Sequence, residues 1–424
     1  MPQRDGDSGP KNPADPQHQQ HPQHPHHHRR RGRRRRALRA ALPRLSKFAL
    51  EHLLLLPLGA VIALVWVNID RESYYPFAFS LAFPVNDIAM AIFFAVIMKE
   101  VVEATAPGGV LHPWRRTLLA VIVGIAAAAV PALVHERVVD MLDEPMLDVG
   151  MPMTLAADLA VIYFMARLIF RRHPMVPLLL LLGIASNAFG FVLLAVLYPT
   201  RDPEIVTGVL LLVAAVGVAL ALRYRRVRSF WPYLIGSGSL FWFAFFRLGV
   251  HPALALVPMM PFLPHAPRDP GFFIDPPPHA KDTLNKFEWW WRYPAQVALF
   301  LFGLINAGVP AGALEAGTWG LPIALLTGKP IGVLVGAGLA VLVGLHLPRR
   351  VGWRELLVGG FLAALGFTVG LFFGTAIIPP GQLRSELNMG VMISLAAAPV
   401  ALLLARMLHV GRFGPHHVAH TTTP

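Results

Sequence analysis

The dominant feature of the sequence is a succession of apolar segments, most of them about as long as a lipid bilayer is thick. A helix needs about 20 apolar residues to cross the hydrocarbon core, and there every backbone polar group must bond within the protein. We therefore predict an all-α membrane protein with twelve transmembrane helices. The segments cover roughly residues 48–68, 85–106, 117–134, 152–170, 175–198, 205–222, 232–246, 250–263, 294–313, 320–344, 355–378 and 389–410.

The charges between these segments support the count of twelve and predict an orientation. Cytoplasmic loops of membrane proteins carry an excess of Lys and Arg, and here alternate loops do so. The basic loops contain Lys99, Arg115, Arg116, Arg171, Arg172, Arg223, Arg225, Arg226, Arg228, Lys281, Lys286, Arg292, Arg349, Arg350 and Arg354. The other loops are poor in cations, and loop 135–151 contains five acidic residues. Merging the short segments 232–246 and 250–263 would break this alternation, so twelve spans with both termini in the cytoplasm are expected.

The two ends of the chain differ from the apolar part in composition. Residues 1–47 hold twelve Lys or Arg against three Asp, together with many His, Pro and Gln. This composition predicts a disordered cytoplasmic tail, followed by a membrane domain at 48–412 and a C-terminal cytoplasmic tail at 413–424. The arginines could bind anionic lipid, and the histidines could bind a metal, although a solvated tail is the simpler interpretation. Because the basic charge lies outside the folded part, a nucleic-acid-binding protein is not expected.

Several other classes of function find no support in the sequence. The chain has no cysteine, which excludes disulfides, thiolate metal sites and cysteine nucleophiles. His251 has no nucleophile or metal partner nearby in the sequence, so we interpret it as structural rather than catalytic. No motif indicates a cofactor. A membrane enzyme is therefore disfavoured, while a channel, a transporter and a scaffold stay open at this point.

Among the ionisable residues within the apolar segments we consider four: Asp87, Glu100, Asp158 and Lys329. A charge near the middle of the bilayer costs at least ~3 kcal/mol, so each is a functional candidate. Asp87 could instead be a helix N-cap at the interface, and the position of Glu100 beside Lys99 favours a solvated helix end. Asp158 and Lys329 lie deeper, and a structural ion pair between them is the main alternative to a functional role.

Glycines mark a possible interruption in the segment at 355–378. Gly359, Gly360, Gly366, Gly370 and Gly374 punctuate it, and they could allow close helix packing or break the helix. The segment at 152–170, which contains Asp158, would run antiparallel to it. Interrupted helices at corresponding places in two inverted halves are typical of the ion site of a secondary transporter, so the sequence favours an ion-coupled transporter.

Several short motifs in this order resemble the NhaA-type bacterial sodium/proton antiporters. They lie at 85–94, 130–133, 249–255, 306–309, 328–332 and 365–368, and the resemblance covers roughly residues 48–412. It implies the family fold, with inverted repeats and crossed interrupted helices four and eleven. It also implies electrogenic exchange of Na⁺ or Li⁺ for external protons in the bacterial inner membrane, for pH and sodium homeostasis, and it allows a homodimer.

The resemblance also implies which residues form the transport site. The family has two adjacent aspartates in span five, and Ser186 and Asn187 occupy their positions here. Its lysine of span ten is retained as Lys329, and its threonine-aspartate pair of span four is reduced to Ala157-Asp158. The ion-binding set implied is Asp158, Asn187, Ser186, Lys329 and Thr368, with Asp158 as ligand of the transported Na⁺. Asp87, Glu100 and Glu288 match acids that the family uses near its transport funnel and in its response to pH.

The replaced aspartates leave two hypotheses open. A carboxylate binds a small cation when ionised and loses that affinity when protonated, whereas Ser186 and Asn187 supply only neutral oxygens. In the first hypothesis Asp158 takes over as the titratable ligand. In the second, the chain is a non-antiporting relative that keeps the fold for another substrate, such as an anion at Lys329, or for an interaction through its basic tail.

Overall fold

The computed structural model describes residues 55–105, 114–171, 173–265 and 282–414, and its regular elements there are all helical. The predicted N-terminal tail at 1–47, the beginning of the first predicted span, and all but the first two residues of the C-terminal tail predicted at 413–424 lie outside the described residues. The first half contains α2 (Leu55–Ile69), α3 (Arg71–Phe83), η1 (Pro84–Ala89), α4 (Met90–Thr105), α5 (Trp114–Leu142), η2 (Pro145–Leu155), α6 (Leu159–Phe170), α7 (Met175–Leu197) and α8 (Ile205–Tyr224).

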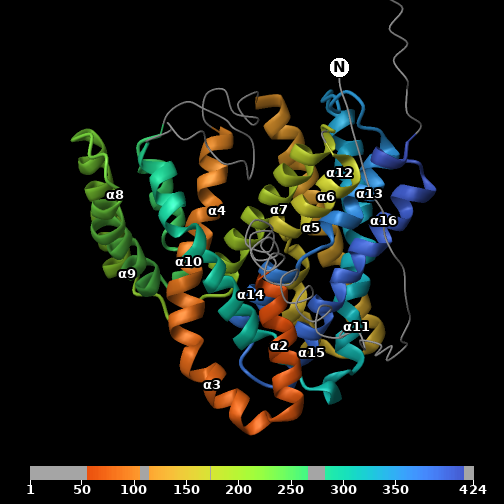
Figure 1. Ribbon diagram of the computed structural model, residues 1–424, viewed down its shortest axis with the longest axis horizontal. Helices are drawn as coiled ribbons and strands as arrows, with labels where there is room; N and C mark the ends of the chain where they lie inside the picture. Colours follow the sequence, from red (N-terminus) through yellow and green to blue (C-terminus); the bar gives the residue numbers. More distant parts are fainter. Residues whose placement is uncertain (1–54, 106–113, 172, 266–281, 415–424) are drawn as a thin grey trace, which may run out of the picture. The chain divides into compact units, whose positions relative to one another are not determined.

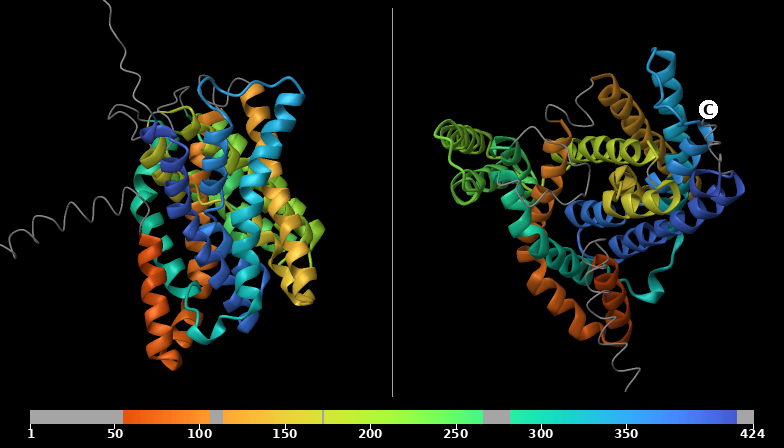
Figure 2. Two further views of the ribbon diagram at one scale, coloured as in Figure 1. Left: turned by 90° about the vertical axis from the view of Figure 1, so that its right-hand side faces the viewer. Right: turned by 45° about the horizontal axis from the view of Figure 1, so that its top comes forward.

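The second half begins with a π-helical turn and ends with a short 3₁₀ helix (Figure 1). Its elements are η3 (Tyr233–Gly238), α9 (Ser239–Leu248), η4 (Pro252–Leu254), η5 (Val257–Phe262), α10 (Thr283–Asn306), η6 (Ala311–Ala313), α11 (Ala316–Ile323), η7 (Ala324–Gly328), α12 (Lys329–Leu342), α13 (Trp353–Ala363), α14 (Phe367–Ile377), α15 (Gln382–Ile393), η8 (Ser394–Ala396), α16 (Ala397–Met407) and η9 (Gly411–Phe413). Helices α8 and α9 pack side by side at one edge (Figure 2).

The described helices support a multi-pass membrane protein. Six are long and apolar enough to cross a bilayer, and two bent pairs bring the number to eight if each pair is one span. The six are Arg71–Thr105, Thr117–Leu142, Met175–Leu197, Ile205–Tyr224, Gly317–Leu342 and Gln382–Phe413. Of the remaining predicted spans, 232–246 forms a shorter apolar helix, and 250–263 contains only the 3₁₀ helices η4 and η5.

Two predicted helix boundaries differ from the structure. The span expected at 85–106 belongs to one 35-residue helix, Arg71–Thr105. Pro84 cannot donate a backbone hydrogen bond, but it opens the π-helical turn η1, so the helix continues through it. The span expected at 294–313 begins earlier, at Thr283, because the Asp282 side chain accepts a hydrogen bond from the Asn285 amide (2.8 Å) and caps α10.

The predicted interruptions in the fourth and eleventh segments are both present. η2 and α6 meet at an angle of 58°, and α13 and α14 meet at 43°. The two breaks lie against each other, because the Asp158 amide donates a hydrogen bond to the Leu365 carbonyl at 2.6 Å. A Cβ on Gly366 would lie 3.1 Å from the Ala156 carbonyl oxygen, so a glycine here permits the close approach of the two chains.

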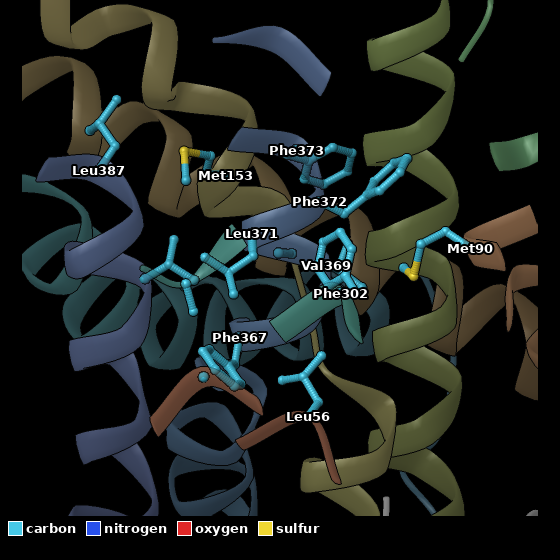
Figure 3. Close-up of a cluster of buried hydrophobic side chains, with 14 of the residues drawn as sticks. Leu56, Met90, Met153, Phe302, Phe367, Val369, Leu371, Phe372, Phe373 and Leu387 are labelled. Carbon is cyan, nitrogen blue, oxygen red and sulfur yellow. The ribbon is translucent and has the colours of Figure 1, made fainter. Parts of the chain in front are cut away.

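Helix α14 places apolar side chains in the interior of the bundle. Figure 3 shows them beside residues from α2, α4, η2, α10 and α15, and those labelled are Leu56, Met90, Met153, Phe302, Phe367, Val369, Leu371, Phe372, Phe373 and Leu387. All ten are at most 5% exposed, and they belong to one hydrophobic cluster. The break between α13 and α14 is thus held in place by packing on several sides.

A row of glycines on α12 and the turn before it fixes the position of Lys329. Gly328, Gly332 and Gly336 are spaced four residues apart and face α5. A Cβ on Gly332 would lie 2.5 Å from the Ala126 carbonyl oxygen, and one on Gly336 would lie 2.8 Å from the Val123 Cα. Small residues at this spacing let two helix backbones approach closely, and they bring Lys329 toward the interior.

We expect Gly332→Ala to destabilise the protein, because the added methyl group would force α12 away from the backbone of α5. Overpacking of this kind costs about 1–3 kcal/mol. The control is Gly217→Ala on α8, where a Cβ meets no atom within 4 Å. Because Ala has the better helix propensity, this change should leave the stability unchanged or raise it. Thermal unfolding of both purified variants is the measurement, and an unchanged melting temperature in Gly332→Ala would contradict this packing.

Candidate functional site

Asp158 lies in the break of the fourth predicted segment, where it caps α6. Its backbone is extended, and its Oδ1 accepts a hydrogen bond from the Val161 amide at 3.2 Å. Its Oδ2 accepts one from the Thr368 amide at 3.0 Å and another from the Thr368 hydroxyl. Two helices, α6 and α14, therefore direct the positive ends of their dipoles at one carboxylate that is 3% exposed.

Lys329 is fully buried and points at a different part of the same break. Its Nζ donates to the Leu155 carbonyl oxygen at 3.0 Å and to the Ser186 Oγ at 3.2 Å. The Ser186 hydroxyl in turn donates to the Leu155 carbonyl at 2.7 Å. No ion pair among the described residues includes Lys329 or Asp158. The structural ion pair considered as the alternative is therefore absent from the structure.

Asn187 holds the unwound backbone just before Asp158. Its Oδ1 accepts a hydrogen bond from the Ala157 amide, and its Nδ2 donates to the Ala157 carbonyl, both at 2.8 Å. The break leaves these backbone groups without helical partners, and a buried polar group without a partner is costly. Asn187 thus satisfies both groups and fixes the position of the neighbouring carboxylate.

A small cavity adjoins Asp158, Asn187 and Thr368. Its volume is about 20 Å³, and residues from α2, α4 and α10 complete its wall. A space of that size holds about one water molecule, which makes it suitable for a single small ion. The structure therefore brings all five predicted ion-binding residues to the two crossed breaks, with Asp158, Asn187 and Thr368 at the cavity and Ser186 and Lys329 beside Leu155.

A second group of charges surrounds Lys99 near the end of α4. The Lys99 Nζ lies 3.4 Å from Glu100 Oε1, 2.8 Å from Glu103 Oε2 and 2.8 Å from Glu288 Oε2. Lys99 is 1% exposed and Glu100 9%, so the expectation of a solvated helix end is wrong. The structure does bring together Glu100 and Glu288, two of the predicted site residues, around Lys99. Lys99 and Glu103 were not among the predicted site residues, although their i,i+4 spacing on a helix was a signal.

Asp87 lies apart from both groups. It is within η1, in the middle of the long helix Arg71–Thr105, so the alternative that it caps a helix is wrong. The structure shows its backbone carbonyl accepting a hydrogen bond from the Trp242 Nε1 at 3.3 Å. His251, interpreted as structural, packs edge-on against Phe372 and accepts a hydrogen bond from the Ala253 amide.

Comparison with known proteins adds independent information. The sequence profile of the family described as "Na+/H+ antiporter 1" matches residues 48–405. The chain is 38% identical over 374 residues to "Na(+)/H(+) antiporter NhaA" of Desulfitobacterium hafniense, covering 86% of this chain and 96% of that protein. The protein of the same name from Geobacter metallireducens is 37% identical over 84% of this chain and 95% of its own length. The one from Jannaschia sp. is 33% identical, over 87% and 98%.

We expect Asn187→Ala to destabilise the protein by about 2 kcal/mol or more, because it leaves two buried backbone groups of Ala157 without partners. Asn68→Ala is a matched control. The Asn68 side chain also bonds the backbone, at Leu64, Val309 and Ala311, but it is exposed, so water can replace it at a cost of about 1 kcal/mol or less. Thermal unfolding compares the two variants, and equal losses would contradict the role given to Asn187.

Proposed function

The chain belongs to the Na+/H+ antiporter 1 family, and from that premise we propose that it exports Na⁺ or Li⁺ in exchange for external protons, with Asp158 binding either ion. The observation that carries this assignment is a buried carboxylate, outside any ion pair described, beside a cavity of about 20 Å³. Its position between two broken helices matches the arrangement in which secondary transporters bind ions. The activity is secondary transport and needs no catalytic residue.

Competition between the two ions at Asp158 would couple their movements. The ionised carboxylate is a hard oxygen ligand that suits a small cation, and protonation removes its negative charge. Asn187 and Ser186 already bond the backbone at Ala157 and Leu155, and neither exchanges a proton near neutral pH. The Thr368 hydroxyl, the Asn187 amide oxygen and carbonyl oxygens of the break complete a neutral shell around the single charge.

Lys329 sets the electrostatic balance of this site. With Asp158 ionised, the two charges cancel, and a bound cation leaves the site at +1. In a medium of low dielectric constant such an excess is costly, which favours release of the cation when a proton arrives. Because Lys329 bonds Leu155 and Ser186, the Asp158 carboxylate can change its state without first breaking an ion pair.

The finer architecture extends this proposal. Adding α2, α9, the 250–263 segment and α10 to the eight spans above gives twelve spans, which we assign to two inverted repeats. Both termini would then lie in the cytoplasm, with the protein in a bacterial inner membrane. The alternation of basic loops supports this orientation.

Glu100 and Glu288 around Lys99 would then lie on the cytoplasmic side, where they could respond to pH, and Asp87 would lie toward the outer side of the funnel. The arginine-rich tail suits anionic lipid, and a homodimer is compatible with the family.

We expect Asp158→Asn to abolish cation-dependent proton movement. In everted vesicles, Na⁺ or Li⁺ should dissipate an imposed ΔpH with the wild-type chain, and the variant should give less than about one hundredth of that response, since an amide does not titrate. Asp140→Asn is the control, because Asp140 is exposed and pairs with Arg137; it should behave as the wild type. Full activity of Asp158→Asn would rule out the assignment.

Among the described residues no carboxylate pairs with Lys329, and this favours one second candidate, a non-antiporting relative that keeps the fold for another role. It is the conclusion if wild-type vesicles show no response to Na⁺ or Li⁺ from pH 6 to 9. The double variant Ser186→Asp, Asn187→Asp should then create a response, because it restores two adjacent titratable carboxylates, of which the one at position 186 would face Lys329. If the folded double variant gives no response, the idea that the chain lacks exchange only because these two aspartates were replaced would be contradicted.

We further expect the wild-type exchange to be electroneutral, in contrast to the electrogenic exchange implied by the family resemblance. A single carboxylate can take up one Na⁺ or one proton in each cycle, so no net charge crosses the membrane. In proteoliposomes, a potassium diffusion potential of either sign should leave the initial rate of Na⁺-driven proton flux unchanged. A rate that rises and falls with the potential would show that a second group, such as Lys329, also carries a proton.

A further inference from the structure

A cavity of about 350 Å³ lies at the other end of the long helix from the Lys99 cluster. It is formed by α3, η1, the end of α10 and the beginning of α15, and it is separate from the small cavity at Asp158. The polar residues that line it are Tyr74, Tyr75, Asn86, Asn306, Arg384, Ser385 and Asn388. Among the described lining residues there is one cation and no acid.

Arg384 is the charged group of this cavity. Its Nη2 donates a hydrogen bond to the Asn306 Oδ1 at 3.0 Å, and within the described part of the chain this is the hydrogen bond that its guanidinium makes. No carboxylate among the described residues forms an ion pair with it. The acid that follows on α15, Glu386, points at Gly317 on α11 instead. A guanidinium has five donors, so most of the hydrogen-bonding capacity of Arg384 is available to a ligand.

A network of amides holds Arg384 in this orientation. The Asn306 Nδ2 donates to the Asn86 Oδ1 at 2.8 Å and to the Phe302 carbonyl at 3.0 Å. The Asn388 Nδ2 donates to the Asn306 carbonyl at 3.1 Å. Asn306 therefore joins η1, α10 and α15, and its fixed Oδ1 orients the guanidinium. A preorganised arginine loses little side-chain entropy when it binds a ligand.

We propose that this cavity binds an oxyanion of the phosphate type through Arg384. A planar guanidinium matches the oxygens of a phosphate in two parallel hydrogen bonds, and a partly buried positive charge without an acidic partner gains from an anion. The Ser385 hydroxyl lines the same space and can donate a further bond. The charge of the cavity repels cations, so this site is distinct from the cation route at Asp158.

The phosphate could come from solution or from a lipid headgroup. The cavity wall on α3 includes Phe79, which is 80% exposed, and Tyr75, which is 44% exposed. An exposed apolar wall of this kind suits contact with lipid acyl chains, and such contact would place a headgroup beside Arg384. Both sources present the same chemistry to the site, and the experiment separates them.

The test uses the full chain in nanodiscs and does not depend on cation exchange. In phosphatidylcholine nanodiscs, inorganic phosphate is titrated and the thermal midpoint is followed by tryptophan fluorescence. In a second series, phosphatidylglycerol replaces part of the phosphatidylcholine. We expect a saturable rise of the midpoint in at least one series. A rise with phosphate supports a soluble anion, and a rise only with phosphatidylglycerol supports a lipid headgroup.

Variants connect the response to the cavity. Arg384→Gln should raise the apparent Kd at least tenfold, and Asn388→Asp should do the same by placing a carboxylate one turn away on the same face of α15. Arg137→Gln is the matched control, because Arg137 is an exposed arginine paired with Asp140, and it should keep the wild-type response.

The proposal is overturned if neither series stabilises the wild type, or if Asn388→Asp and any folded Arg384→Gln respond as the wild type does. Since Asn388→Asp retains Arg384, it tests the site even where Arg384→Gln does not fold.

Discussion

The hydrogen bond between the Asp158 amide and the Leu365 carbonyl joins the two places where helices are interrupted inside the bundle. Backbone groups there have lost their helical partners, and without water each one must find another. They find them in each other, in the Asn187 amide and in the Ser186 hydroxyl. The rest of the site depends on this constraint, because the same breaks expose the helix ends that hold the charges.

The charges are distributed according to the ends of the broken helices. Asp158 receives amide donors from the beginnings of α6 and α14, whereas Lys329 donates to the carbonyl at the end of η2. Each is stabilised by the pole of opposite sign, so neither needs the other. Lys99 is the contrast: three carboxylates surround it within 3.4 Å. A network of that kind is fixed by its own partners, whereas no cation among the described residues pairs with Asp158, as the proposed exchange of ions at its carboxylate requires.

Much of this arrangement could be predicted from the sequence, and the remainder depends on packing. The depth of Asp158 and Lys329 in apolar segments indicated the site, and the glycines before Thr368 indicated the second break. The early starts of the helices at Arg71 and Thr283 could not be predicted from hydropathy, because the side chains of Asp70 and Asp282 cap them and a π turn at Pro84 lets the first helix continue. The burial of Lys99 depends on Glu288, which is distant in the sequence, and so does not follow from local pattern.

The two positions where the family has aspartates are not equivalent in this structure. A carboxylate at 186 would lose one hydrogen bond to Leu155 but would face the Lys329 amine, now 3.2 Å from the Ser186 Oγ. A carboxylate at 187 could still accept from the Ala157 amide, yet it could not donate to the Ala157 carbonyl, so two oxygens would oppose each other without a proton. The amide of Asn187 satisfies both groups at once. Position 187 is therefore constrained by the backbone of the break, and position 186 by the charge of Lys329.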